Sequence, residues 1–346
     1  MTRFVGWMAL AVAMAGALAA CSGSQATQSP TGNAQAGNPP VTGGSQPSAP
    51  VVKHALVIDL DGATYGALKA GVAAGTLPNL ARLQIQLAYS GGMAGTLGQQ
   101  ATFDTPGWAT LLTGAWAARH QVLSDAPQQT PHSATLFQMT KASSTGLNGM
   151  VAASSGLAQL FSADHSAGYL DTLVDCSESA TASDCVTSQA VQMIDKGYTT
   201  IFAQYHAAQD AAIDYGTGAL QYGNTLTQLD QSVGTLMAET AKDSNIQWLI
   251  LVTGNHGLSA NSQNDGLPLV PESTTFVGMN QSANNGSGFT AVAAPTTFSQ
   301  LYASPSIADV TPTLLAYLNE APAAAANTMD GGELLGAQPA SQLVAT

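Results

Sequence analysis

Charged residues are scarce in this chain of 346 residues, and basic residues are the scarcest of them. Lys and Arg together number eight against 21 Asp and Glu, which gives a formal net charge of −13. Proteins that bind nucleic-acid backbones need clustered Lys and Arg to neutralise phosphates, and no stretch of this sequence concentrates them. The composition therefore argues against a nucleic-acid polymer as partner.

Cysteine is also scarce, with three residues in the chain. Cys176 and Cys185 enclose a polar loop, and in an oxidising compartment a pair at this spacing is typical of a disulfide. The alternative is a zinc site, but two cysteines without nearby histidines supply too few ligands for one. The spacing favours the disulfide, and Cys21 has a separate explanation.

The first 21 residues predict export. Arg3 precedes an apolar run that ends in Leu18-Ala19-Ala20-Cys21, and small residues before a cysteine are typical of a lipoprotein cleavage site, where Cys21 becomes lipidated. An ordinary secretory signal and a transmembrane anchor are the alternatives, although the run is shorter than the roughly 20 residues of a span. We expect a protein anchored by lipid to a bacterial membrane, facing the periplasm or the cell surface. Ser22 after Cys21 favours the outer membrane by similarity to other lipoproteins.

The composition divides the rest of the chain into three parts. Residues 22–50 carry no charged side chain and are rich in Ser, Gly, Gln, Thr and Pro, so they predict a flexible linker. Residues 51–320 are long enough for one large α/β domain. Residues 321–346 are rich in Ala and Pro, and we expect a loosely held tail.

Apolar runs alternate with segments of helical periodicity across the central part. The pattern predicts strands at 55–62, 149–153, 199–205, 246–253 and 275–278, and helices at 64–74, 78–87, 106–113, 188–196, 220–242 and 309–318. Such alternation predicts an α/β three-layer sandwich whose central, mostly parallel sheet is flanked by helices.

Ligands of such sheets gather at the carboxyl ends of strands, and several polar residues lie at or just beyond these ends. Asp61 closes the first predicted strand, Asp210 and Asp214 follow a later one, and Asn255-His256 follows the strand at 246–253. Taken singly, each has an ordinary explanation as a turn residue, a solvated acid or a structural histidine. Thr105 lies just before a predicted helix, where a helix N-cap is the simpler interpretation.

The order and spacing of these segments resemble the alkaline-phosphatase superfamily, on its type I phosphodiesterase/nucleotide-pyrophosphatase side. The resemblance runs from about Val51 to Asn319, and the block PGWATLLTG is its most specific part. It is carried by VIDLDG (57–62), LPNLARL (77–83), TPGWATLLTG (105–114), RH (119–120), WLILVTGNHG (248–257) and DVTPTLL (309–315). The resemblance implies a two-metal phosphoesterase with hard oxygen and imidazole ligands around divalent cations.

Carried over position by position, the resemblance implies metal ligands at Asp61, Asp210, Asp214, Asn255 and His256. Three departures weaken this set. Asp214 stands where the family has histidine, and Asn255 stands where it has aspartate, so an anionic ligand becomes a neutral carbonyl. The family's last histidine has no counterpart, because the sequence contains no histidine after His256. The acids near this gap are Asp265 and Glu272.

The implied nucleophile is ambiguous. The family spaces a Thr or Ser two residues before the proline that is Pro106 here, and this register places Asp104 at the position, with Thr105 one residue late and Thr102 two early. Asp104 and Thr105 are therefore both candidate catalytic residues. A carboxylate there is suited to ligating a metal or to attacking phosphorus through a different intermediate.

Two functions remain open. The first is a metal-dependent hydrolase with an altered metal site. Its substrate would be a small phosphate mono- or diester, or a sulfate ester. The cations would be Zn²⁺ by family resemblance, or Ca²⁺, Mg²⁺ or Mn²⁺, which suit the remaining hard oxygens better. The second is an inactive pseudo-hydrolase kept as a surface or periplasmic binding module. Loss of anionic ligands weakens zinc binding, and the interpretation favours the hydrolase because an altered site is still able to turn over. The sequence predicts no oligomeric state.

Overall fold

The computed structural model describes residues 51–259, 261–284, 294–320 and 328–335. They form one seven-stranded sheet of order β2-β7-β6-β1-β5-β3-β4, in which only β7 runs antiparallel to its neighbours. The strands are β1 (Val52–Leu60), β2 (Gln84–Tyr89), β3 (Asn148–Ala152), β4 (Thr172–Asp175), β5 (Thr200–Tyr205), β6 (Ile246–Thr253) and β7 (Thr274–Met279). The predicted mostly parallel α/β sheet is confirmed.

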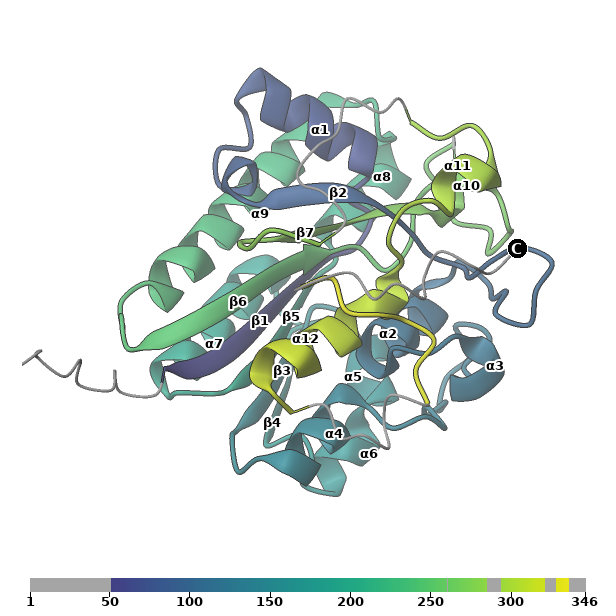
Figure 1. The fold of residues 1–346 in the computed structure, drawn as a ribbon. Helices are drawn as coiled ribbons and strands as arrows, with labels where there is room; N and C mark the ends of the chain where they lie inside the picture. The colour runs from purple at the N-terminus through teal and green to yellow at the C-terminus, as the bar shows by residue number, and fades with distance from the viewer. Residues whose placement is uncertain (1–50, 260, 285–293, 321–327, 336–346) are drawn as a thin grey trace, which may run out of the picture. The chain divides into compact units, whose positions relative to one another are not determined.

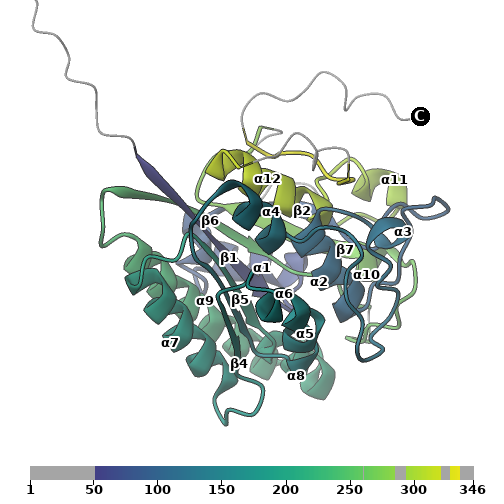
Figure 2. The same ribbon diagram turned by 90° about the horizontal axis from the view of Figure 1, so that it is seen from below.

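Helices cover both faces of the sheet and complete three layers (Figures 1 and 2). The helices are α1 (Tyr65–Ala74), α2 (Asp104–Thr113), α3 (Ala117–His120), α4 (Leu136–Ser143), α5 (Ser155–Leu160), α6 (Ser162–Ser166), α7 (Ala182–Asp195), α8 (Ala207–Tyr215), α9 (Leu220–Thr240), α10 (Val270–Ser273), α11 (Phe298–Leu301) and α12 (Val310–Leu318), with the 3₁₀ turns η1 (Leu80–Arg82) and η2 (Ile307–Asp309). One buried core lies under α1, α7, α8 and α9, and the other lies under α2, α4, α5 and α12.

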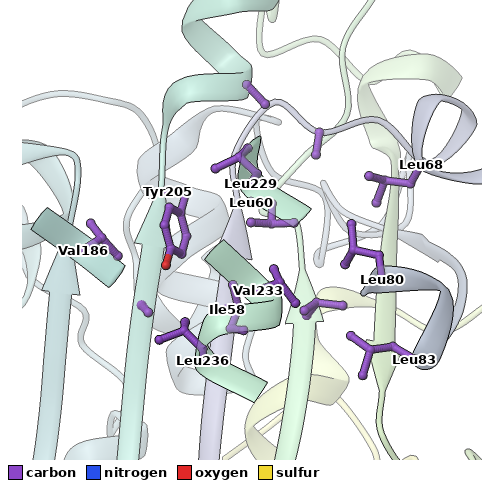
Figure 3. Close-up of a cluster of buried hydrophobic side chains, with 14 of the residues drawn as sticks. Ile58, Leu60, Leu68, Leu80, Leu83, Val186, Tyr205, Leu229, Val233 and Leu236 are labelled. Atoms are coloured by element: carbon purple, nitrogen blue, oxygen red, sulfur yellow. The ribbon is translucent and has the colours of Figure 1, made fainter. Parts of the chain in front are cut away.

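Strand β1 shows why the site forms on one particular face. Side chains of a strand alternate between the two faces of a sheet. Ile58 and Leu60 join the core under α9, where Figure 3 shows them beside Leu229 and Val233. Val57 joins the core on the opposite face, which α2 covers. The acids at 59 and 61 follow the same alternation as Val57, so β1 delivers them towards α2.

One predicted element is wrong. The segment 78–87 forms no continuous helix; it makes the single turn η1 and then enters the edge strand β2, which pairs antiparallel with β7. Leu80, Leu83 and Leu87 fit helical spacing, but Ile85 and Leu87 are also two residues apart and point into one core. Pairing with β7, distant in sequence, decides between the two patterns.

Asp230, buried in α9, holds η1 in place. Its carboxylate accepts hydrogen bonds from the backbone N–H groups of Asn79 and Leu80, at 3.1 Å and 2.8 Å, and from the side-chain amide of Asn79 at 2.8 Å. A carboxylate that accepts several N–H donors is well stabilised although it is buried. This contact turns the chain from η1 into the edge strand.

The remaining sequence predictions have three outcomes. The disulfide between Cys176 and Cys185 is confirmed. The loosely held tail is wrong for residues 328–335, because Asp330 accepts from the backbone N–H of Trp116, pairs with Arg119 at 2.8 Å, and is followed by the buried Leu334. The signal segment, Cys21 and the linker 22–50 lie outside the described residues. Among the described helices, none combines the length and the hydropathy needed to cross a bilayer.

Candidate functional site

The candidate site lies at the carboxyl ends of three adjacent parallel strands. The order β6-β1-β5 places these ends side by side. Asp61 directly follows β1, His206 directly follows β5, and Asn255-His256 begins two residues after β6. Helix α2 brings its first residue, Asp104, to the same edge, so four of the sequence-predicted residues meet here: Asp61, Asp104, Asn255 and His256.

Two small residues permit this close approach. A Cβ on Gly107, in the first turn of α2, would lie 2.7 Å from the backbone oxygen of Asn255, so only glycine lets the helix come this close. A Cβ on Gly62 would lie 2.3 Å from Cα of Gln209, and Gly62 also has φ of +73°, a conformation that favours glycine. These contacts explain why the blocks around 62 and 107 have their glycines.

Asp61 is fully buried and surrounded by protein donors. One carboxylate oxygen accepts from the indole N–H of Trp108 at 3.3 Å, and the other accepts from the amide of Gln204 at 2.5 Å and contacts Nδ1 of His206 at 3.2 Å. Burial lowers the pKa of His206, but the hydrogen bond to Asp61 and its charge outweigh burial and raise that pKa to about 9. His206 is therefore a cation at neutral pH, paired with Asp61.

A second acid–histidine pair lies on the α2 side. Nε2 of His256 is 2.6 Å from Oδ1 of Asp104, and the side-chain amide of Asn255 donates to the same oxygen at 3.1 Å. Nδ1 of His256 lies 2.8 Å from the backbone oxygen of Gly257. Burial opposes both charges, yet the hydrogen bond between the partners lowers the pKa of Asp104 and raises that of His256. Both directions favour an imidazolium–carboxylate pair.

Asp59 is a third acid of this face. It is fully buried, and neither carboxylate oxygen has a hydrogen-bond partner of normal geometry among the described residues. Burial first, and then the charge of Asp61, raise the pKa of Asp59 well above its ordinary value. Burial and the neighbouring Asp61 therefore favour the protonated form of Asp59.

The structure distinguishes Asp104 from Thr105. The backbone N–H of Thr105 donates to Asp125 at 2.8 Å, and Thr105 lines a cavity of about 110 Å³ with Asp125 and Gln159. Thr102 contacts the buried Glu272 through its hydroxyl at 3.1 Å. Of Thr102, Asp104 and Thr105, Asp104 is therefore the residue whose side chain contacts those of Asn255 and His256.

The two remaining predicted ligands lie on α8. Asp210 is 67% exposed and has one oxygen 3.7 Å from Nε2 of His206, so it lies at the margin of the site. Asp214 follows one turn later, is exposed, and makes no hydrogen bond or ion pair with described residues. The residue at the end of β5 is His206, which sequence reasoning missed together with Gln204 and Trp108. The rule that placed Asp61 after its strand also applies to His206.

The donor set does not fit the two-metal centre that the resemblance implies. Asp61 already receives three protein donors, Asp104 is bonded to His256, and Asn255 turns its amide, not its oxygen, towards Asp104. Across residues 51–259 and the other described segments, no group of three or more His, Cys, Asp or Glu side chains could hold a metal ion. The side-chain oxygen of Asn255 is buried and has no hydrogen-bond partner among the described residues. It is a single neutral ligand, so it adds no negative charge to hold a cation.

A cavity of about 270 Å³ opens beside Asp104. Its lining includes Phe103, Gln209, Asn264 and two further acids, Asp125 and Asp265. The acids make this cavity unfavourable for a phosphate or sulfate group unless cations accompany it. The acidic lining is therefore unfavourable for a phosphate or sulfate ester substrate in the absence of cations.

The chain matches no protein-family model and no curated protein sequence. Solved structures do share its fold. Ps i-CgsB, solved in complex with k-i-k-neocarrahexaose, superposes with a TM-score of 0.55 at 12% identity over 81% of this chain and 74% of its own. Murine ectonucleotide pyrophosphatase/phosphodiesterase 5 gives 0.53 at 11% identity over 78% and 96%, and BT1596, a 2-O GAG sulfatase, gives 0.52 at 12% identity over 83% and 76%.

Two of these neighbours are named as a nucleotide pyrophosphatase/phosphodiesterase and as a sulfatase. The resemblance inferred from the sequence motifs is therefore confirmed at the level of the fold. At 11–12% identity the likeness extends to the fold alone.

Proposed function

We propose that the chain is a catalytically silent pseudo-hydrolase, a binding module built on the alkaline-phosphatase fold. One observation carries the proposal: the two carboxylates at the centre of the site, Asp61 and Asp104, are each bonded to a histidine of the chain, at 3.2 Å and 2.6 Å. A metal-dependent enzyme of this fold would hold metal cations against these carboxylates. In this chain, His206 and His256 lie against them instead.

Charge supports the same conclusion. Two adjacent divalent cations need several anionic ligands to hold them against water. The raised pKa values of Asp59, His206 and His256 all act in one direction, because each makes the site less negative than ordinary Asp and His side chains would. A cation entering this site would have to displace His206 from Asp61 or His256 from Asp104, and each displacement exposes a buried charge to a less favourable environment.

The second candidate is the metal-dependent hydrolase of phosphate mono- or diesters. It is favoured by the fold and by the meeting of Asp61, Asp104, Asn255 and His256 at one sheet edge. The unpaired buried oxygen of Asn255 also offers one hard ligand. In this candidate, Asp104 would act as ligand or nucleophile, and the cations would be Zn²⁺, Ca²⁺, Mg²⁺ or Mn²⁺.

Metal content and turnover separate the two candidates. We expect the purified full chain to contain less than stoichiometric metal by elemental analysis. We also expect no hydrolysis of nitrophenyl phosphate or bis-nitrophenyl phosphate above a buffer blank, with or without added Zn²⁺, Mn²⁺, Mg²⁺ or Ca²⁺. Asp61→Ala serves as the matched control for contaminating hydrolases. Turnover that requires added metal and disappears in Asp61→Ala would establish the hydrolase instead.

The variant Asn255→Asp probes the register of the site. It restores a carboxylate where the resemblance implies one, beside His256. If the site differs from a metal centre only in charge, this variant gains zinc affinity measurable by calorimetry, whereas Asn264→Asp, on the wall of the neighbouring cavity, does not.

We also infer that the module is anchored by lipid to a bacterial outer membrane. The sequence Leu18-Ala19-Ala20-Cys21 supports the anchor, and the Cys176–Cys185 disulfide supports an oxidising compartment. We expect Cys21→Ser to abolish incorporation of radiolabelled palmitate and to move the protein from the membrane pellet to the soluble fraction. Unchanged labelling would refute the anchor, and Cys176→Ser is the control cysteine variant.

A further inference from the structure

The cavity of about 270 Å³ beside Asp104 is part of the candidate site. Its wall comes from the start of α2, from α8, and from the loops that follow α3 and β6. The lining residues include three acids, Asp104, Asp125 and Asp265, but no Lys, Arg or His. The volume equals that of about nine water molecules in the liquid, so the cavity has room for a small molecule only.

Two of the three carboxylates have no positive partner. Asp104 is bonded to His256, but neither Asp125 nor Asp265 forms an ion pair with a described residue. Asp125 accepts a hydrogen bond from the backbone N–H of Thr105 at 2.8 Å, which is a neutral donor. A positive ligand is therefore attracted to this wall, and an anionic ligand is repelled by it.

A buried hydrogen-bond acceptor in the same wall has no donor. Gln209 lines the cavity and is 6% exposed, yet its side-chain oxygen has no hydrogen-bond partner among the described residues. The same is true of the side-chain oxygen of Asn255, whose amide donates to Asp104 at 3.1 Å. Buried polar atoms of folded proteins are nearly always paired. Both unpaired atoms are acceptors, so a ligand that satisfies them has to donate hydrogen bonds.

Charge and hydrogen bonding together define the class of ligand. Ammonium and guanidinium groups are positive and carry donors but no acceptor, so they match both the unpaired carboxylates and the unpaired oxygens. Phosphate, sulfate and carboxylate groups have the wrong charge and supply acceptors. A neutral hydroxyl group donates a hydrogen bond but leaves the carboxylates without a counter-charge.

Two apolar side chains of the wall extend this match beyond the charged group. Phe103 lies at the start of α2, and Ile213 lies one turn after Gln209 in α8 and is 55% exposed. An alkyl chain that covers Ile213 removes apolar surface from water. The ring of Phe103 offers a contact to an alkyl chain or to the cation itself.

The loop that carries Asp265 is held in place by hydrogen bonds within the protein. The side-chain oxygen of Asn264 accepts from the backbone N–H of Gly266 at 2.9 Å and from the hydroxyl of Thr102 at 3.2 Å, and its amide donates to the backbone oxygen of Thr102. The backbone N–H of Leu267 donates to the buried Glu272 at 3.1 Å. A wall that is fixed before binding loses little conformational entropy when a ligand binds.

From these observations we propose that the cavity beside Asp104 binds a small alkylammonium or alkylguanidinium cation. Asp125 and Asp265 balance its charge, Gln209 accepts one of its N–H groups, and Phe103 and Ile213 contact its alkyl chain. The inference rests on the proposed function, because it names the class of ligand for the same binding module. It is tested by binding, whereas the proposed function is tested by turnover.

The test is isothermal calorimetry on the full chain, purified in detergent, at pH 7 and low ionic strength, where charge interactions are least screened. The probes are 1,4-diaminobutane and agmatine, and we expect saturable binding of both. The fully N-methylated analogue of diaminobutane keeps two positive charges but has no N–H group, so it should bind at least about tenfold more weakly. Inorganic phosphate should not bind.

Two variants of the wall locate the binding. Asp265→Asn removes one unpaired carboxylate and should weaken the binding of 1,4-diaminobutane about tenfold. Gln209→Leu removes the unpaired acceptor and should weaken it by a similar factor. Because that oxygen has no partner in the protein, Gln209→Leu should keep the melting temperature of the parent. Asp265 is exposed, so Asp265→Asn tests the inference even if Gln209→Leu fails to fold.

Asp195→Asn is the matched control, because Asp195 is the exposed last residue of α7 and lies outside the cavity wall. It removes the same charge and should bind as the parent does. No binding of either amine, or equal affinity in the parent, Asp265→Asn and Gln209→Leu, would overturn the inference. Metal-dependent ester hydrolysis by a protein that also binds the amines would overturn the proposed function alone, so the two failures are distinguishable.

Discussion

Replacing His256 by Ala is expected to lower the free energy of unfolding by about 3–5 kcal/mol. The substitution removes the partner of Asp104 and leaves a carboxylate in a mostly buried site with the amide of Asn255 as its remaining side-chain donor. Breaking one half of a buried charge pair has a larger effect than the pair's net contribution, because the other charge stays without compensation. Urea unfolding followed by tryptophan fluorescence measures the change.

Two variants make this result specific. Asp104→Asn combined with His256→Ala removes both charges and should recover part of the loss, which a double-mutant cycle reports as coupling. His132→Ala, an exposed histidine, should change stability by less than about 0.5 kcal/mol. If His256→Ala were as stable as the parent, the histidine would not be holding Asp104, and the hydrolase candidate would gain support.

The second large effect is a dependence of stability on pH that comes from His206. Its pKa in the folded protein is about 9, raised from 6.5 by the hydrogen bond to Asp61 despite burial. A histidine whose pKa is raised on folding stabilises the protein fully below the unfolded value, and this stabilisation is lost as pH rises through the folded value. The window is therefore pH 6.5 to 9, and the shift corresponds to about 3 kcal/mol.

The measurement compares urea midpoints between pH 6 and pH 9.5 for the parent and for His206→Gln. Glutamine keeps a hydrogen-bond donor for Asp61 but does not titrate, so the variant should be less stable at pH 6 and should lose most of the slope. The pKa of His256 is raised as well, so some slope in the same direction should remain. Parallel curves for the two proteins would show that His206 and Asp61 are not paired in solution.

Much of the strand-end site could be predicted from local sequence. The run ending at Asp61 and the run ending before Asn255 are buried parallel strands, which read as apolar in sequence because both faces are covered. Their carboxyl ends meet because neighbouring parallel strands share one edge. Cys176 and Cys185 could be paired from spacing alone.

The residues that sequence reasoning missed depend on register and partnership. The family resemblance implies Asp210 and Asp214 as ligands, but the first residue beyond β5 is His206, and both acids lie on α8, further from the edge. The segment 78–87 fits two periodicities at once, and only its pairing with β7 selects the strand. Neither the place of His206 in the site nor the strand in segment 78–87 can be predicted from a stretch of ten residues alone.

The sequence by itself determined the α/β class, five of the seven described strands, and the strand-end positions of Asp61, Asn255 and His256. These follow from apolar patterning, which each segment carries locally. Only the tertiary structure decided that His206 and His256 face Asp61 and Asp104 as paired charges, and that acids from separate loops line one cavity beside Asp104. Electrostatic balance and cavity shape depend on distances between segments up to about 150 residues apart, so they arise only when the chain is folded.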